Sequence, residues 1–263
     1  MSFAPVIPMT GYAGWTFLSR TLERQQESFV ESGTVKRATE YFRENIGKAT
    51  TAEALVGDRR LLEVALGAFG LEDDINAKAF IRKVLSDGTI KDGALANRLA
   101  DKRYAQFSFA FGYGNGVPTV ATSSFADKII ARYEDRQFEA AVGEVDGTLR
   151  QALNFSDALG DVVAGASSNN ARWYSVMGNT SLRNMFEVAL GLPTSFGTLD
   201  VDQQLATFKE RSDSVFGTDQ VADFANEESR EKLIRLFLVR SEIAANASGY
   251  SAGQVALSLL QSS

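Results

Sequence analysis

The sequence contains no cysteine and no histidine. The absence of cysteine excludes disulfides, thiolate nucleophiles and sulfur-ligated metal sites, although it leaves the redox compartment open. The absence of histidine removes the commonest general base and the commonest transition-metal ligand. A Ser-His-Asp triad and an ordinary catalytic zinc site are therefore excluded for this chain acting alone. We predict no bound metal and no cofactor.

Positive charge and long apolar runs are also scarce. The net charge is −6, and the lysines and arginines do not cluster, so we expect no nucleic-acid binding. No stretch approaches the roughly 20 apolar residues of a membrane span. Residues Met1–Pro8 lack the basic start and apolar core of a Sec-type signal peptide. We expect a cytoplasmic protein, and export without a cleaved signal through a flagellar or injectisome apparatus stays open.

Apolar residues recur mainly at helical spacing. The clearest amphipathic pattern, at positions i, i+3, i+4, i+7 and i+8, is formed by Ala77, Phe80, Ile81, Val84 and Leu85. Residues 107–113 alternate like a strand, but the segment that corresponds to them, 233–239, has helical spacing. Because 44% of the residues are hydrophobic, the chain can bury a sizeable core. We predict an all-α protein.

Short polar motifs mark several expected helix starts. The Ser/Thr-x-x-Glu pattern of Thr50–Glu53 is a capping box and predicts a helix that begins there. Gly57 and Asp58 are expected to break that helix in two. Asp92 and Asp200 are candidate N-caps for later helices.

The chain contains an apparent internal duplication. The pentapeptide Glu63–Gly67 returns as Glu187–Gly191, 124 positions later. Weaker matches flank it at offsets of 112 and 129 positions, and small loop insertions between homologous helices would produce such a drift. Convergence of amphipathic helices is the alternative.

We therefore predict two pseudo-repeated multi-helix halves that pack as one compact helical protein. The expected boundaries are an N-terminal arm at 1–11, a first helical repeat at 12–124 and a second at 125–245. A tail with a short amphipathic helix follows at 246–263.

Two motifs superficially resemble a phosphate-binding loop and a catalytic serine site. Gly112–Gly116 resembles a glycine-rich phosphate loop, but its spacing is wrong and no βαβ pattern precedes it, so a loop between repeats is favoured. Ser229–Lys232 has the Ser-x-x-Lys spacing that can activate a serine. The companion motifs are absent, so a solvated helix surface is favoured there.

Paired carboxylates are the remaining catalytic option, because two of them suffice for glycoside hydrolysis. The visible pairs are Asp73-Asp74 and Glu227-Glu228. Both precede or open expected helices, where negative charge stabilises the helix dipole, so capping is favoured over catalysis. The spacing of a calcium-binding EF-hand loop is absent.

Aromatic and apolar residues near the ends of the chain are the candidate partner-binding residues. The aromatic N-terminal segment either packs on its own core or offers an anchor to another protein. The same choice holds for the C-terminal segment. The candidates are Tyr12, Trp15 and Phe17, then Tyr113 in the loop between repeats, then Val255, Leu259 and Leu260.

The sequence resembles an uncharacterised alphaproteobacterial family, the domain of unknown function numbered twelve-seventeen. The resemblance covers most of the chain and lies in Gly11–Trp15, Tyr41–Ile46, Asp58–Leu71, Phe80–Leu85 and Leu99–Tyr104. It implies genes that often lie among flagellar genes, and it carries no catalytic residues.

Two functions from different classes follow. The first is a non-enzymatic accessory or assembly protein linked to the bacterial flagellum, which acts through protein-protein contacts. The second is a carboxylate-dependent hydrolase that acts on the cell wall. The partner and the oligomeric state stay open.

Overall fold

The computed structural model describes residues 3–249, with side chains described as far as residue 246. Within this range the regular structure consists only of α-helices and 3₁₀-helices, which confirms the predicted all-α class. No helix in the same range is both long and apolar enough to cross a membrane.

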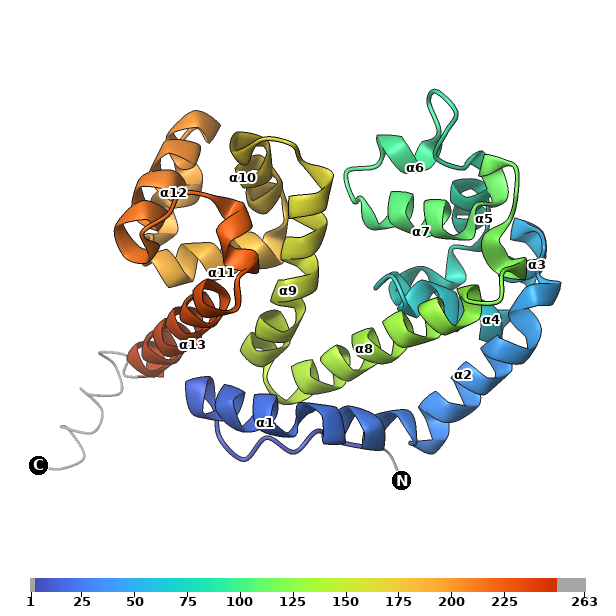
Figure 1. Cartoon of the computed structure of the whole chain (residues 1–263), viewed down its shortest axis with the longest axis horizontal. Helices are drawn as coiled ribbons and strands as arrows, with labels where there is room; N and C mark the ends of the chain where they lie inside the picture. The colour runs from blue at the N-terminus through green and yellow to red at the C-terminus, as the bar shows by residue number, and fades with distance from the viewer. Residues whose placement is uncertain (1–2, 250–263) are drawn as a thin grey trace, which may run out of the picture. The chain divides into compact units, whose positions relative to one another are not determined.

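The chain forms two compact units. Among the described residues, unit 1 comprises 3–5 and 21–141, and unit 2 comprises 6–20 and 142–249. Two long helices, α1 (Gly11–Val30) and α8 (Phe125–Val145), are drawn in Figure 1. Each of them has one end in unit 1 and the other end in unit 2. Each of these two helices is continuous across a boundary between the units and contributes residues to both.

The remaining elements follow in chain order. In unit 1 they are α2 (Gly33–Asn45), η1 (Ile46–Lys48), α3 (Ala52–Gly57), α4 (Arg59–Gly67), η2 (Glu72–Asn76), α5 (Lys78–Asp87), α6 (Leu95–Arg98), α7 (Arg103–Phe111), η3 (Tyr113–Asn115) and η4 (Thr119–Ala121). In unit 2 they are α9 (Gly147–Gly165), α10 (Asn169–Gly178), α11 (Thr180–Leu190), η5 (Thr194–Thr198), α12 (Val201–Phe216), η6 (Val221–Ala225) and α13 (Glu227–Gly249).

Aromatic rings fill the core of unit 1. Phe107 and Phe111, one turn apart on α7, are fully buried with their ring centroids 5.0 Å apart. Phe69 and Phe125 pack edge-on against this pair at 5.4 and 5.1 Å. Phe109 points outward and is 69% exposed. The alternating phenylalanines of this segment therefore lie on a helix, and the two buried rings are four residues apart.

The core of unit 2 is built around Trp173 on α10. Its indole is fully buried between Phe186 on α11 and Phe208 on α12, at centroid distances of 5.1 and 5.4 Å. The indole N–H donates a 2.8 Å hydrogen bond to the carbonyl oxygen of Asp219. Burial therefore leaves no unsatisfied donor on this ring.

The predicted capping box is wrong by one residue. Thr51, rather than Thr50, is the N-cap of α3, and its hydroxyl accepts a 3.1 Å hydrogen bond from the Ala54 amide. With Thr51 as the N-cap, Ala54 occupies the last position of the box, so Glu53 cannot complete it, and its carboxylate instead lies 3.7 Å from Arg82.

The other expected helix starts have mixed outcomes. Asp58 ends α3 and caps α4, and Asp200 caps α12, which confirms both predictions. Asp92 does not cap α6, whose N-cap position is Ala94 and carries no side-chain hydrogen bond. The cause is Gly93, whose positive φ of 77° turns the chain between Asp92 and the helix.

Candidate functional site

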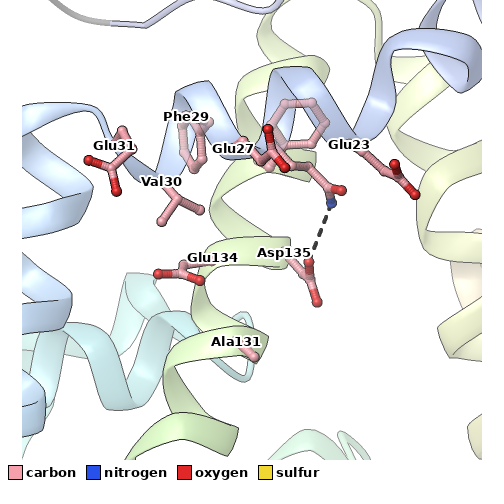
Figure 2. A pocket seen from close by; sticks show the side chains of 10 residues that line it. Glu23, Glu27, Phe29, Val30, Glu31, Ala131, Glu134 and Asp135 are labelled. Atoms are coloured by element: carbon pink, nitrogen blue, oxygen red, sulfur yellow. Dashed lines mark hydrogen bonds between the residues drawn. The ribbon is translucent and has the colours of Figure 1, made fainter.

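An open groove in unit 1 is the candidate functional site. It lies between the second half of α1 and the middle of α8 and has a volume of about 650 Å³. Glu23 and Glu27 share one face of α1 at four-residue spacing, and Glu31 continues this spacing one residue beyond the end of the helix at Val30. Glu134 and Asp135 face them from α8 (Figure 2). Five carboxylates therefore surround the groove, and its lining contains no lysine or arginine.

Beneath this acidic rim the groove is apolar. Phe29 of α1 and Phe138 of α8 pack edge to face with a centroid distance of 5.7 Å, and both are nearly fully buried. The ring of Phe3 packs on the same two rings at 5.5 and 6.5 Å. Val30 and the exposed Ala131 complete the apolar lining. A phenylalanine cluster thus joins the two helices that form the groove.

The carboxylates of the groove differ in their surroundings. Glu31 pairs with Lys36 at 2.7 Å, and both side chains are exposed. Asp135 accepts a 3.4 Å hydrogen bond from the side-chain amide of Gln26, drawn as the dashed line in Figure 2. Burial raises the pKa of Glu134, an effect that Arg43 partly opposes and Asp135 reinforces.

The arrangement suits an extended set of positive charges better than one metal ion. Figure 2 shows the Glu134 side chain directed toward the end of the groove where Glu31 lies, whereas Asp135 is directed toward Gln26. In the part of the chain that the structure describes, no three acidic side chains form a group that could hold a metal ion. The negative charge is therefore distributed along the groove.

The aromatic residues at the start of α1 have an internal partner in unit 2. The Tyr12 hydroxyl and the Trp15 indole N–H both donate hydrogen bonds of 3.2 Å to the carboxylate of Glu231 on α13. The guanidinium of Arg235 lies 5.3 Å from the centre of the Tyr12 ring. Tyr12, Trp15 and Phe17 are all half-buried. Of the two alternatives for this segment, the structure describes the one in which it packs on its own protein.

Tyr113 is also held internally. Its hydroxyl donates a 2.5 Å hydrogen bond to the carbonyl oxygen of Ala49, its ring stacks on Phe111, and burial raises its pKa. The Asn115 side-chain oxygen in the same loop accepts hydrogen bonds from the amides of Thr89 and Ile90, at 2.8 and 3.3 Å. The glycine-rich segment 112–116 is thus a loop that packs on the end of α5.

The other predicted residues lie away from the groove. Asp74 in η2 accepts a 2.5 Å hydrogen bond from the Tyr104 hydroxyl, and Glu227 and Glu228 occupy the first turn of α13. The structure therefore does not bring the two predicted carboxylate pairs into the groove. Val255, Leu259 and Leu260 lie outside the described residues.

The amino-acid sequence alone does not predict the groove. The available signal is the four-residue spacing of Glu23, Glu27 and Glu31, but an ordinary solvated helix face has the same pattern. The facing residues of α8 come more than a hundred positions later in the chain. Only the pairing of α1 with α8 shows that these charges share a site.

The structure is that of an all-α protein with an acid-rimmed, apolar-floored groove. The chain belongs to the family described as Protein of unknown function (DUF1217), whose sequence model matches residues 68–229. This confirms the family that the sequence resembles. No curated protein matches the chain significantly.

The chain is also similar to a solved structure, the X-ray crystal structure of protein AGR_C_984 from Agrobacterium tumefaciens. The two share 26% sequence identity with a TM-score of 0.72, and the match covers 92% of this chain and 99% of that chain.

Proposed function

We propose that this protein is a non-enzymatic accessory protein that acts through protein-protein contacts in the assembly of the bacterial flagellum. The observation that supports the contact role is the groove between α1 and α8, which combines an apolar floor with five carboxylates at its edge. Protein-binding surfaces commonly have an apolar centre that excludes water and a polar rim. The flagellar role rests on the family, whose genes we expect to lie near flagellar genes. The partner is expected in the cytoplasm.

We also propose that the two halves of the chain arose by duplication. The order of elements supports this: α1 is followed by α2, η1, α3, α4, η2, α5, α6, α7, η3 and η4, and α8 is followed by α9, α10, α11, η5, α12, η6 and α13. In this correspondence each α-helix of the first half has a counterpart at the same place in the second, the short α6 corresponding to the 3₁₀-helix η6, whereas η1, η3 and η4 have no counterpart.

Helix caps support the same correspondence. Asp58 ends α3 and caps α4, whereas Asn179 ends α10 and caps α11, and each side-chain oxygen accepts from the second and third amides that follow it. At the far ends of these helices, Gly70 and Gly191 both have positive φ, of 65° and 67°. Both pairs of positions, 58 with 179 and 70 with 191, are separated by 121 residues.

This register differs from that of the repeated pentapeptide. The pentapeptides are 124 positions apart, so they are shifted by about one helical turn relative to the caps. Gly67 lies at the end of α4 in helical conformation, whereas Gly191 is the left-handed residue after α11. We propose that the ancestral register is that of the caps, because they fix where the helices begin and end.

An affinity purification from motile cells tests the contact role. Ala131 is exposed in the groove, so Ala131→Phe should fill the groove without removing a charge. Ala244→Phe, at an exposed position of α13, is the matched control. We expect flagellar components to copurify with the wild type and the control and to be lost with Ala131→Phe. Recovery of no flagellar component with the wild type would overturn the flagellar proposal.

A further inference from the structure

We infer that the groove between α1 and α8 binds a basic amphipathic segment of a partner protein. In this complex, lysine or arginine side chains lie along the acidic rim and an aliphatic or aromatic side chain contacts the apolar floor. The inference rests on the proposed contact role and specifies the chemistry of the partner.

The charge distribution selects a basic partner. Glu23 and Glu27 are separated along α1 by about 6 Å, the rise of four helical residues, and Glu31 follows directly after the end of this helix. Lysines or arginines at helical spacing on a partner would repeat at the same interval. Among the described residues, Glu31 has a paired lysine, whereas no ion pair is formed by Glu23, Glu27 or Glu134. The rim therefore retains negative charge that a cationic segment would neutralise.

The floor requires that the segment also carries an apolar side chain. A volume of about 650 Å³ lies within the range of sites that enclose several side chains. Val30 and Ala131 offer apolar surface to an inserted side chain, whereas the rings of Phe29 and Phe138, which also line the groove, are nearly fully buried. A purely cationic chain would satisfy the rim and leave this surface in contact with water. Charge and apolar contact are therefore required together, as in the recognition of amphipathic helices by grooves.

Partial burial of Glu134 supports the same partner. Burial raises the pKa of this carboxyl, so its ionised form is incompletely solvated. A cation placed beside it would restore the lost stabilisation of the charge.

Three helical peptides test the inference by fluorescence anisotropy with the full-length protein. The first has leucine and lysine at helical spacing, the second has glutamate in place of lysine, and the third has serine in place of leucine. We expect the leucine-lysine peptide to bind, the leucine-glutamate peptide not to bind, and the serine-lysine peptide to bind at least about tenfold more weakly, the equivalent of one lost apolar contact of about 1.4 kcal/mol. Added salt should weaken binding, because the rim is exposed.

Matched variants distinguish peptide binding in the groove from general attraction by the negative net charge of the protein. Glu27→Gln with Glu134→Gln removes two charges of the rim, and Glu210→Gln with Glu228→Gln removes two exposed charges of unit 2. We expect the first pair to weaken binding of the leucine-lysine peptide about tenfold and the second by less than about twofold. Ala131→Phe should abolish binding with all charges retained, and circular dichroism confirms that each variant is folded.

Three results would overturn the inference. These are equal weakening by the two double variants, unchanged affinity in Ala131→Phe, or a dimer of the free protein that Ala131→Phe dissociates, which would make a second copy the occupant. If the peptides fail to bind while flagellar components still copurify with the protein, this inference fails and the proposed function stands. If the peptides bind as expected and no flagellar component copurifies, the flagellar proposal fails and the inference stands.

Discussion

Gly88 and Gly114 lie with their backbones in contact, so that neither position has room for a side chain. A Cβ atom on Gly88 would lie 2.7 Å from the carbonyl carbon of Gly114, and a Cβ atom on Gly114 would overlap the backbone of Gly88. Gly88 also has a positive φ of 70°. This contact joins the end of α5 to the glycine-rich loop, which explains the loop's composition by packing.

The first prediction follows from this contact. Gly114→Ala should lower the free energy of unfolding by about 1–3 kcal/mol, the usual cost of overpacking a site that cannot move. Gly160→Ala is the control, because Gly160 lies in α9 with open space around its Cβ position. That change should raise the free energy of unfolding by about 0.5–1 kcal/mol, since alanine favours a helix. Chemical denaturation measures both, and equal effects would exclude the close approach as the cause.

The second prediction concerns the cap shared by α3 and α4. Asp58 accepts a 2.6 Å hydrogen bond from the Tyr41 hydroxyl and caps the amides of Arg60 and Leu61. Asp58→Ala should lower the free energy of unfolding by about 1–2 kcal/mol, because the cap is lost and Tyr41 loses its acceptor. Asp58→Asn should cost less, because asparagine can cap, as Asn179 does at the start of α11.

The pH dependence of this effect has a defined sign. Burial alone would raise the pKa of Asp58, but hydrogen bonds from Tyr41 and the amides of Leu61 and Arg60 lower it overall. The stabilisation by Asp58 is therefore present above its ordinary pKa of 3.8 and is lost as the pH falls through the lower pKa of the folded state. The difference between the wild type and Asp58→Asn should shrink on acidification, and a difference that grows would contradict this assignment.

The third prediction concerns Glu134, whose pKa is raised by burial. An acid with a raised pKa binds more protons in the folded than in the unfolded state. The free energy of unfolding therefore falls as the pH rises from the ordinary value of 4.5 through the pKa of the folded state. Glu134→Gln should raise the melting temperature at neutral pH, and this gain should vanish in mild acid. Glu210→Gln, an exposed control on α12, should show no such pH-dependent gain.

Local signals predict the fold of this chain better than they predict its site. The all-α class and the break at Asp58 follow from apolar spacing and from a residue that caps the helix next to it. The Asp92 cap fails because one residue, Gly93, redirects the chain. The groove is not predicted because it needs Glu27 and Glu134 side by side, and no local pattern specifies which helices pair. Tyr113, a candidate partner-binding residue because of its loop position, donates a hydrogen bond to the Ala49 carbonyl, which no local sequence pattern indicates.

The last prediction separates the two glycines of the repeated pentapeptide. At Gly67 a Cβ atom would lie 2.8 Å from a ring atom of Tyr133, so the constraint is space. At Gly191 the φ of 67° is left-handed, and the nearest atom to a Cβ is the mobile guanidinium of Arg240, so the constraint is backbone conformation. Alanine should destabilise at both positions, by about 1–3 kcal/mol at Gly67 and about 1–2 kcal/mol at Gly191.

Asparagine distinguishes the two causes. It tolerates left-handed backbone, so Gly191→Asn should cost less than Gly191→Ala, whereas Gly67→Asn should cost more than Gly67→Ala because it is larger. Removing the facing ring with Tyr133→Ala should reduce the cost of Gly67→Ala and leave that of Gly191→Ala unchanged in a double-mutant cycle. If both glycines respond to asparagine in the same direction, the assignment of crowding to Gly67 and of backbone conformation to Gly191 is wrong.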